Sequence, residues 1–295
     1  MRNRDYNKEL VKRGEMLIDL SLFGSPTTPD TKPKRGRPYT YPKALIFLLL
    51  LLKFSLRLPY RQTEGLARKI FSSLGVTIPN FRTLHYRLTK EEINLEDLPQ
   101  IEKLQDDFVI VLDSTGLKVT NRGEWLRKKH GRRTRKGWIK LHVAFDINSK
   151  QVVSVEVTDE KTHDSQKAEE LVETARQKAK EKCKRVEKVI ADGGYDTHRI
   201  FRDMHERGIE ACILPRSSAR ISGNIARDKV IRLIRRSKRV WKEASGYGKR
   251  WLVESFFSVF KRWFGEYVSH VKFENIRKEV VFKVWIINLF LNLGT

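Results

Sequence analysis

The spacing of apolar residues divides the chain into a helical first part and a mixed second part. In the first part, apolar positions recur every three to four residues, as in amphipathic helices. We expect helices at about 6–20, 43–57, 59–74 and 80–90. Gly75 is a suitable stop for the third helix, and Asn80 is a good N-cap for the fourth.

The second part alternates apolar runs of strand length with helical patterns. We expect strands at 108–112, 138–146, 151–157, 186–192 and 209–214. Helices are expected at 164–181, 196–207 and 247–264. Strands that alternate with helices predict a central mixed sheet covered on both faces, and therefore an α/β fold.

Changes in composition suggest where the domains meet. Residues 24–42 are rich in Pro, Thr and basic side chains, which is typical of a linker. Residues 90–105 are acidic and form a natural boundary. We expect an N-terminal helix with a basic linker over 1–40, a small all-α domain over 41–104, and the α/β domain over 105–295.

The helix expected at 247–264 has an unusual distribution of side chains. At about 100° per residue, Tyr247, Arg250, Glu254 and Lys261 form one narrow polar stripe. The opposite side, which we expect in a core, carries Leu252, Val253, Phe256, Val259, Phe260 and Trp263. An Arg250–Glu254 ion pair on a solvated face is an equally simple interpretation of this stripe.

The charge balance points to a polyanionic partner. The chain has 60 Lys and Arg against 36 Asp and Glu, a formal net charge of +24. Lys and Arg neutralise phosphates and release counterions, so nucleic acid is the favoured partner and an anionic membrane surface the alternative. The two cysteines have no zinc-finger spacing, no apolar run spans a bilayer and no signal peptide is evident. We therefore expect a soluble, cytoplasmic protein.

Basic residues gather in three places that could contact DNA. The helices at 59–74 and 80–90 are arranged like a helix-turn-helix, with Arg82 and Arg87 expected to point outward, although many packing hairpins look similar. A second cluster, at 122–140, includes Arg132, Arg133, Arg135 and Lys136. The third cluster covers 216–242. Such charge runs can also be solvated faces, and that alternative stays open at this stage.

Two aspartates follow apolar strands and suggest a metal site. Asp113 ends the run at 108–112, and Asp192 ends the run at 186–192. Strand ends of this kind bind ligands, although Asp also commonly begins a turn. Together with Glu254, these carboxylates are suitable ligands for two Mg²⁺ or Mn²⁺ ions, which can activate a water or a 3′-hydroxyl. Asp146, Asp159 and Asp164 are rival carboxylates of lower rank.

These motifs resemble those of prokaryotic insertion-sequence transposases of the DDE type. The group concerned carries a signature of Tyr, two residues, Arg, three residues, Glu, six residues and Lys, which Tyr247, Arg250, Glu254 and Lys261 match at every spacing. Asp113-Ser114-Thr115 resembles the first aspartate motif, and Asp192-Gly193-Gly194-Tyr195 resembles the second. The resemblance extends from the N-terminal helix nearly to residue 295.

The resemblance implies a ribonuclease-H-like catalytic domain preceded by a helix-turn-helix-like domain. It implies Asp113, Asp192 and Glu254 as ligands of two Mg²⁺ ions, with Tyr247, Arg250 and Lys261 at the terminal DNA strands. The implied reaction is cleavage at the terminal inverted repeats and joining of the 3′-hydroxyl to target DNA, by a homodimer associated with the nucleoid. The alternatives are a DNA-binding regulator with an inactive catalytic domain and a structure-specific nuclease on the same fold.

Overall fold

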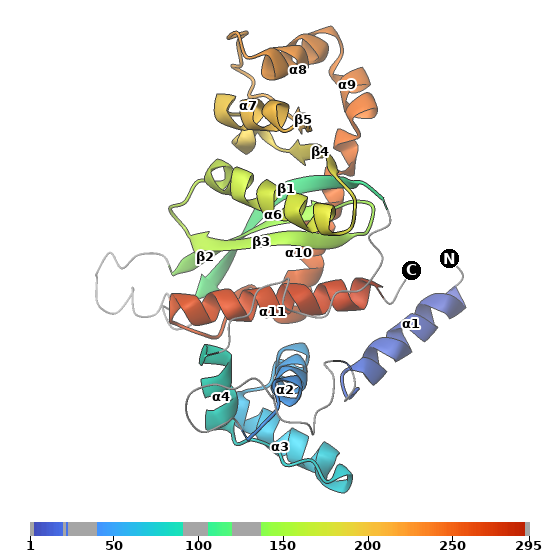
Figure 1. Cartoon of the computed structure of the whole chain (residues 1–295), viewed down its shortest axis with the longest axis vertical. Coiled ribbons are helices and arrows are strands. Elements are labelled where there is room, and N and C mark those ends of the chain that lie inside the picture. Colours follow the sequence, from blue (N-terminus) through green and yellow to red (C-terminus); the bar gives the residue numbers. More distant parts are fainter. Residues whose placement is uncertain (1–2, 20–21, 23–39, 91–105, 120–136, 293–295) are drawn as a thin grey trace. The chain divides into compact units, whose positions relative to one another are not determined.

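The computed structural model describes residues 3–19, 22, 40–90, 106–119 and 137–292, and the chain divides into two compact units. Unit 1 comprises Met1–Ile101 together with Lys272–Thr295, and unit 2 comprises Glu102–Val271. The described part of unit 1 is helical, whereas unit 2 contains a sheet (Figure 1).

Unit 1 begins and ends its helices largely where the sequence predicts. Its elements are α1 (Asn3–Met16), α2 (Lys43–Ser55), α3 (Tyr60–Phe71), the 3₁₀ helix η1 (Ser72–Leu74), α4 (Phe81–Lys90) and α11 (Phe273–Asn292). Gly75 follows η1 in the left-handed conformation, with φ of 64°. The Asn80 side chain accepts a hydrogen bond from the Thr83 N–H at 2.8 Å. The expected helix stop and N-cap are therefore confirmed.

Helices α3 and α4 pack against each other. The Glu64 carboxylate of α3 accepts a hydrogen bond from the N–H of Phe81, the first residue of α4, at 2.7 Å. The rings of Tyr60 and His85 lie edge to face with their centroids 5.3 Å apart. The two helices and their short connection form the expected hairpin. Binding of α4 in a DNA groove stays a prediction.

Helix α11 packs with the N-terminal helices. Its Phe282 ring lies 5.7 Å from Phe47 and 5.8 Å from Phe54, both on α2. Its Lys278 ammonium donates a hydrogen bond to the Thr89 carbonyl of α4 at 2.7 Å. Compact unit 2 is thus shorter than the domain expected over 105–295, because α11 packs its apolar residues against helices of unit 1.

Unit 2 is built on a six-stranded mixed sheet with the order β3-β2-β1-β4-β5, and β6 beside β1. The strands are β1 (Phe108–Val119), β2 (Trp138–Asp146), β3 (Gln151–Asp159), β4 (Val186–Ala191), β5 (Glu210–Ile213) and β6 (Tyr267–Val268). β1 pairs antiparallel with β2 but parallel with β4, so both pairing directions meet at this central strand. This sheet, flanked by helices, confirms the expected α/β class and is consistent with a ribonuclease-H-like fold.

The helices of unit 2 cover both faces of the sheet. They are η2 (Asp164–Lys167), α6 (Ala168–Glu181), η3 (Gly193–Tyr195), α7 (His198–Glu206), α8 (Ile225–Arg236), α9 (Lys238–Ser245), η4 (Tyr247–Arg250) and α10 (Trp251–Phe264). Phe145 of β2 packs on Phe256 of α10, with ring centroids 5.8 Å apart. Lys140 of β2 binds Asp164 of η2, which leads into α6. Because side chains alternate along a strand, α10 and α6 lie on opposite faces (Figure 1).

Candidate functional site

Asp113 and Asp192 come together where the pairing of two central strands ends. The parallel pairing of β1 with β4 stops at Leu112 opposite Ala191, so the two aspartates are the next residue on each chain segment. The expectation that Asp113 ends its strand is wrong, because β1 runs from Phe108 to Val119. β1 continues to Val119 because its polar residues keep pairing with β2, for example Ser114 opposite His142.

Glu254 reaches the same place from α10 through a shared arginine. The Arg250 guanidinium, in η4 just before α10, donates a hydrogen bond to Asp113 Oδ2 at 2.9 Å. It also donates to Glu254 Oε1 one turn along. The expected Arg250–Glu254 pair therefore exists, but it does not stand alone on a solvated face. It includes a carboxylate of the central strand.

The three carboxylates are close enough to influence one another. Burial is the main reason that the pKa of Asp113 is raised above the ordinary carboxyl value, and the charges of Asp192 and Glu254 add to the rise. The Ser114 N–H, which donates to Asp113 at 2.9 Å, and the Arg250 charge act against it. This mutual repulsion shows an acidic cluster with one cation drawn into it.

The cluster has the chemistry of a divalent metal site, although its geometry is not preformed. Carboxylate oxygens are the ligands that Mg²⁺ and Mn²⁺ prefer. The Arg250 cation bridges two of the acids, so a positive charge already lies between them. Among the residues that the structure describes, no three acidic, His or Cys side chains stand in a metal-binding arrangement. The residues fit a metal ion in donor type and charge once Arg250 moves aside.

The buried face of α10 differs in part from the expected one. Val253, Phe256 and Phe260 are buried as predicted. Val259, however, is 38% exposed, whereas Phe257 and Phe264 are buried. The first turn, Tyr247–Arg250, is a 3₁₀ helix with three residues per turn. Within α10, Val253, Phe256, Phe257, Phe260 and Phe264 share one face at 100° per residue, and Val259 lies at the edge of that face.

Tyr247 and Lys261, the ends of the expected polar stripe, lie in different surroundings. Tyr247 is buried, and its ring packs on Trp241 of α9 with centroids 5.2 Å apart. Burial is the main cause of its raised pKa. Lys261 lies in the last turn of α10 and is partly exposed. The exposed part of the stripe is therefore formed by Glu254 and Lys261, with Arg250 partly covered.

The two arginines expected to point outward from α4 have different positions. Arg82 is exposed. Arg87 is only 1% exposed, and its guanidinium donates a hydrogen bond to the Tyr41 carbonyl at 2.7 Å. The outward assignment of Arg87 is wrong because this residue lies beside Leu84 and Leu88 on the buried face. The basic residues Arg132, Arg133, Arg135 and Lys136 lie outside the described residues.

A second polar cluster, which we did not predict, lies on the α6 face of the sheet. Asp164 accepts a hydrogen bond from Lys140 at 3.0 Å, and its Oδ1 is 3.8 Å from His142 Nδ1. His142 is fully buried and shares a hydrogen bond of 2.8 Å with Thr158. Burial lowers the pKa of His142 to about 4. The alternation of Lys140 and His142 in β2 was the available sequence signal.

A buried ion pair fixes α8 to the loop after the second aspartate motif. The guanidinium of Arg227 binds both carboxylate oxygens of Asp196, at 2.6 and 3.0 Å. The Arg216 N–H donates to the same carboxylate at 2.9 Å. The side chains of Arg227 and Asp196 are 8% and 1% exposed. Such a pair requires both partners, because either charge alone would be buried without compensation. No local spacing or motif predicts that these residues pair, because they lie 31 positions apart.

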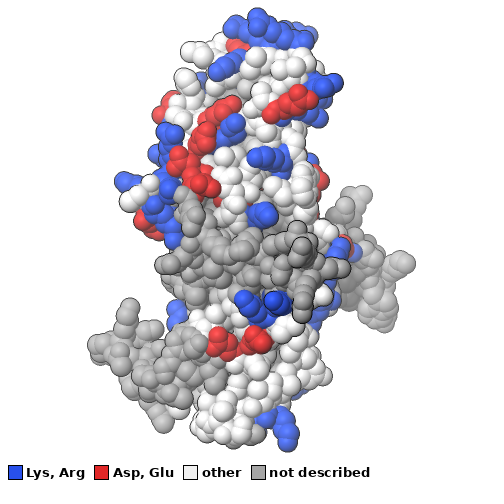
Figure 2. Space-filling view, turned by 90° about the vertical axis from the view of Figure 1, so that its right-hand side faces the viewer, with Lys and Arg blue, Asp and Glu red and all other residues white. Residues whose placement is uncertain are grey.

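Exposed basic side chains gather on α8 and α9. Figure 2 shows them at the top of unit 2. They are Arg232, Arg235, Arg236, Lys238, Arg239 and Lys242. We call this set the α8–α9 basic surface. It lies within the basic run that we expected at 216–242, and it follows the ion pair of Arg227 that anchors α8.

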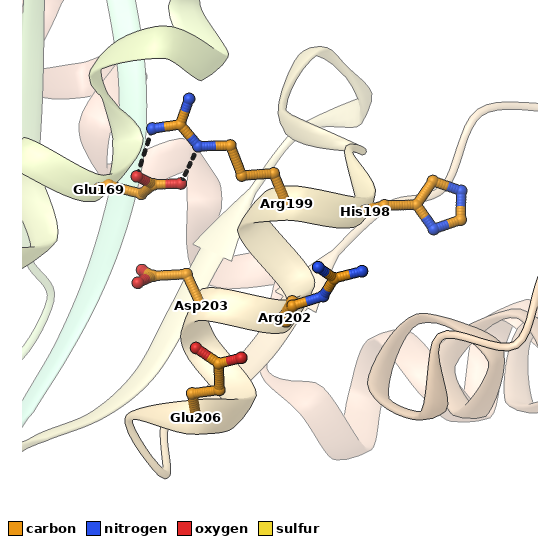
Figure 3. Close-up of a pocket in the computed structure, with 6 residues that line it drawn as sticks. All are labelled: Glu169, His198, Arg199, Arg202, Asp203 and Glu206. Atoms are coloured by element: carbon orange, nitrogen blue, oxygen red, sulfur yellow. Dashed lines mark hydrogen bonds and ion pairs between the residues drawn. The ribbon is translucent and has the colours of Figure 1, made fainter.

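A polar pocket on α7 lies apart from the acidic cluster. Figure 3 shows its lining side chains, which are Glu169, His198, Arg199, Arg202, Asp203 and Glu206. The Arg199 guanidinium donates two hydrogen bonds to the Glu169 carboxylate of α6. None of the expected site residues lines this pocket.

Within the described part of the chain, no helix has both the length and the apolar character needed to cross a membrane.

Comparison with family models agrees with the motifs of unit 2. A family model described as "Transposase DDE domain" matches residues 105–289, more than half of the chain. A second model with the same description matches residues 11–122. The first match includes Asp113, Asp192 and Glu254.

Proposed function

Because this chain belongs to the family of transposases with a DDE domain, we propose that it cleaves DNA at transposon ends and joins the freed 3′-hydroxyl to target DNA. Membership of the family makes the protein a transposase, an enzyme that acts on DNA and belongs to a group that generally uses divalent metal ions. The specific reaction is our proposal. The observation that supports it is that Arg250 joins Asp113 to Glu254, while the Asp192 charge acts on the same Asp113 carboxylate.

Asp113, Asp192 and Glu254 are the proposed ligands of two Mg²⁺ or Mn²⁺ ions. Bound ions of this kind activate a water or a 3′-hydroxyl and stabilise the leaving oxygen of a phosphodiester. Asp113 is held by the pairing of β1 with β2, opposite Val143, and Asp192 caps η3 by accepting a hydrogen bond from the Gly194 N–H at 2.8 Å. Glu254, with a side chain 53% exposed, can approach these two fixed aspartates from α10.

Arg250 and Lys261 are proposed to hold the DNA strand that is cut. Arg250 leaves the carboxylates when metal binds, and its guanidinium then binds phosphate in a bidentate manner. Lys261 lies 11 residues further along the helix, about 16 Å at 1.5 Å per residue. The two cations can therefore contact phosphates on either side of the cleaved bond. We assign the chain to the Tyr-Arg-Glu-Lys group on this basis, with Tyr247 supporting Arg250 through its packing on Trp241.

DNA further from the site is proposed to contact the α8–α9 basic surface and Arg82 of α4. Phosphate contacts of this kind position the duplex without reading its sequence. The expected DNA is the pair of terminal inverted repeats together with the target. Two ends must react together, so the reacting complex is proposed to be a homodimer.

The test is a cleavage and joining assay with the full chain. The substrate is a plasmid that carries the two inverted repeats flanking the gene, incubated with Mg²⁺ and a second, target plasmid. We expect strand cleavage at the repeat ends and joined products with the wild-type chain. Glu254→Gln should lose both products, whereas Glu181→Gln, an exposed acid at the end of α6, should keep them.

The other outcomes would favour a different function or a different third ligand. Cleavage without joining would favour a structure-specific nuclease. Specific binding of the repeats without cleavage would favour a regulator. If Glu254→Gln retained full activity, Glu254 would not be the third ligand.

A further inference from the structure

Arg216, in the loop after β5, lies beside the second aspartate motif. The last residue pair between the parallel strands β4 and β5 is Ala191 with Ile213, so both strands end at the edge of the sheet where Asp192 follows. The Arg216 Nε donates a hydrogen bond to the Gly193 carbonyl at 3.3 Å. The guanidinium is therefore bound to the residue that comes directly after a proposed metal ligand.

The loop after β5 approaches the motif closely at Gly193. A Cβ on this residue would lie 3.3 Å from the Leu214 carbonyl oxygen and 3.9 Å from Arg216 Cγ. The Leu214 N–H also donates to the Ala191 carbonyl at 3.3 Å. A larger residue than glycine would push the loop away, so the sequence of the motif itself permits this contact.

Helix α8 fixes the backbone of the loop. The Arg216 N–H donates to the Asp196 carboxylate at 2.9 Å, and the same carboxylate is bound by Arg227 in the buried ion pair. Arg227 also donates to the Arg220 carbonyl at 3.0 Å. The next residue of α8, Asp228, accepts hydrogen bonds from two N–H groups further along the loop. A cation on a segment that is already ordered loses less conformational entropy when it binds a ligand.

The outer end of the Arg216 side chain is open to solvent. The residue is exposed, and among the residues that the structure describes none bonds its two terminal nitrogens, Nη1 and Nη2. These two groups form a planar fork that matches two oxygens of a phosphate. Exposed arginines are commonly solvated and held by nothing. This one is held at its backbone and at Nε, and its fork is available for an anion.

We propose that Arg216 binds a backbone phosphate of the DNA end that reaches the acidic cluster, next to the bond that is cleaved. This rests on the proposed function, in which Asp192 is a metal ligand and DNA is cut there. Carboxylates repel phosphates, so a strand at this edge of the sheet needs cations around it. Arg250 and Lys261 supply them from η4 and α10, and Arg216 supplies one from the loop that leads into the α8–α9 basic surface.

The test measures binding of the full chain to short duplexes that carry one terminal repeat, by fluorescence anisotropy in EDTA. EDTA removes divalent ions, so the DNA stays uncut and the result does not depend on the proposed metal ligands. A series of duplexes carries one uncharged methylphosphonate at successive positions around the repeat end. For the wild type, we expect the affinity to fall about tenfold or more at one position, because hydrogen bonds to a charged group are lost. Arg216→Gln should bind the unmodified duplex about as weakly and lose nothing further at that position.

Matched variants separate phosphate binding from a general loss of positive charge. Arg202→Gln removes an exposed arginine of α7 and should respond to each methylphosphonate like the wild type. Arg216→Lys keeps the charge without the fork, so its affinity should lie between those of the wild type and Arg216→Gln. The hydrogen bond to Asp196 comes from the backbone and survives these substitutions, so the melting temperature of Arg216→Gln should match the wild type.

The outcomes separate the role of Arg216 from the proposed function. If Arg216→Gln loses as much affinity as the wild type at every methylphosphonate position, the role of Arg216 is overturned and the proposed function stands. If the melting temperature of Arg216→Gln also falls, the side chain serves the fold alone. If the wild type binds the repeat end no more tightly than an unrelated duplex, the proposed function itself is wrong, and the role of Arg216 falls with it.

Discussion

Arg250 and Asp113 are 137 positions apart in the chain, yet the guanidinium Nη1 lies 2.9 Å from the Asp113 carboxylate. The same guanidinium binds Glu254. One cation thus joins the central strand to α10 and neutralises two acids that would otherwise repel each other. A metal ion that uses these acids must compete with Arg250.

This competition predicts that Arg250→Gln binds metal more tightly. Removal of the guanidinium frees both carboxylates, and hydrogen bonds to charged groups contribute about 1.5–3 kcal/mol, so the Mn²⁺ affinity should rise about tenfold or more. DNA cleavage should fall in the same variant, because the proposed phosphate contact is lost. Titration with Mn²⁺ measures the first effect, with Arg202→Gln on α7 as the exposed control. Unchanged Mn²⁺ affinity would contradict the competition.

Arg82 and Arg87 should respond to substitution in opposite ways. Arg82→Gln removes an exposed cation of α4, so DNA binding should weaken and its logarithmic salt dependence should decrease by about 0.9 for one phosphate contact. Arg87→Gln removes a buried hydrogen-bond donor to Tyr41, so the free energy of unfolding should fall by about 2 kcal/mol with an unchanged salt dependence. Fluorescence anisotropy across a NaCl series and urea unfolding measure the two effects. Similar behaviour of both variants would refute the assignment.

His142 should make the stability of the protein depend on pH. Burial lowers its pKa to about 4 in the folded chain, while the unfolded chain takes up the proton near the ordinary value of 6.5. The unfolded state therefore binds more protons in this window, and stability should fall by up to about 3 kcal/mol as the pH decreases from 6.5 to 4. Urea unfolding at several pH values should show a smaller fall for His142→Gln than for the wild type. His205→Gln, at an exposed position of α7, should keep the wild-type slope.

Asp196→Asn should destabilise the chain strongly. It leaves the Arg227 guanidinium buried without its carboxylate, a change that costs about 3 kcal/mol or more. Burial alone would raise the pKa of Asp196, but the hydrogen bonds from Arg227 and Arg216 lower it below 3.8. The stabilisation is therefore complete above pH 3.8 and is lost as the pH falls through the lower, folded-state value. Urea unfolding at pH 7 checks the loss, and Asp106→Asn at an exposed position should have little effect.

The sequence predicts elements well where side-chain periodicity and caps agree. The expected strand at 138–146 matches β2, because Ile139, Leu141, Val143 and Phe145 alternate along it up to Asp146, which starts a turn. The N-cap at Asn80 follows from side-chain chemistry within three residues. Local signals of this kind need no knowledge of distant segments.

Features that depend on distant partners could not be predicted in the same way. The polar residues after Asp113 look like a turn, and only their pairing with β2 makes them part of β1. Arg87 has the composition of a surface residue, but a carbonyl 46 positions away accepts its hydrogen bond. The acids of the candidate site were found by spacing, whereas the bridge through Arg250 needed the structure.

The packing of α11 on α2 has a consequence for the order in which the chain folds during synthesis. The ribosome synthesises α2 early. Phe47 and Phe54 can pack on Phe282 only after all of unit 2 has been translated. The sheet, whose strands lie between residues 108 and 268, can form first. The N-terminal helices are thus synthesised first but finish packing last. A nascent chain therefore contains Asp113, Asp192 and Glu254 before α11 is available to complete unit 1.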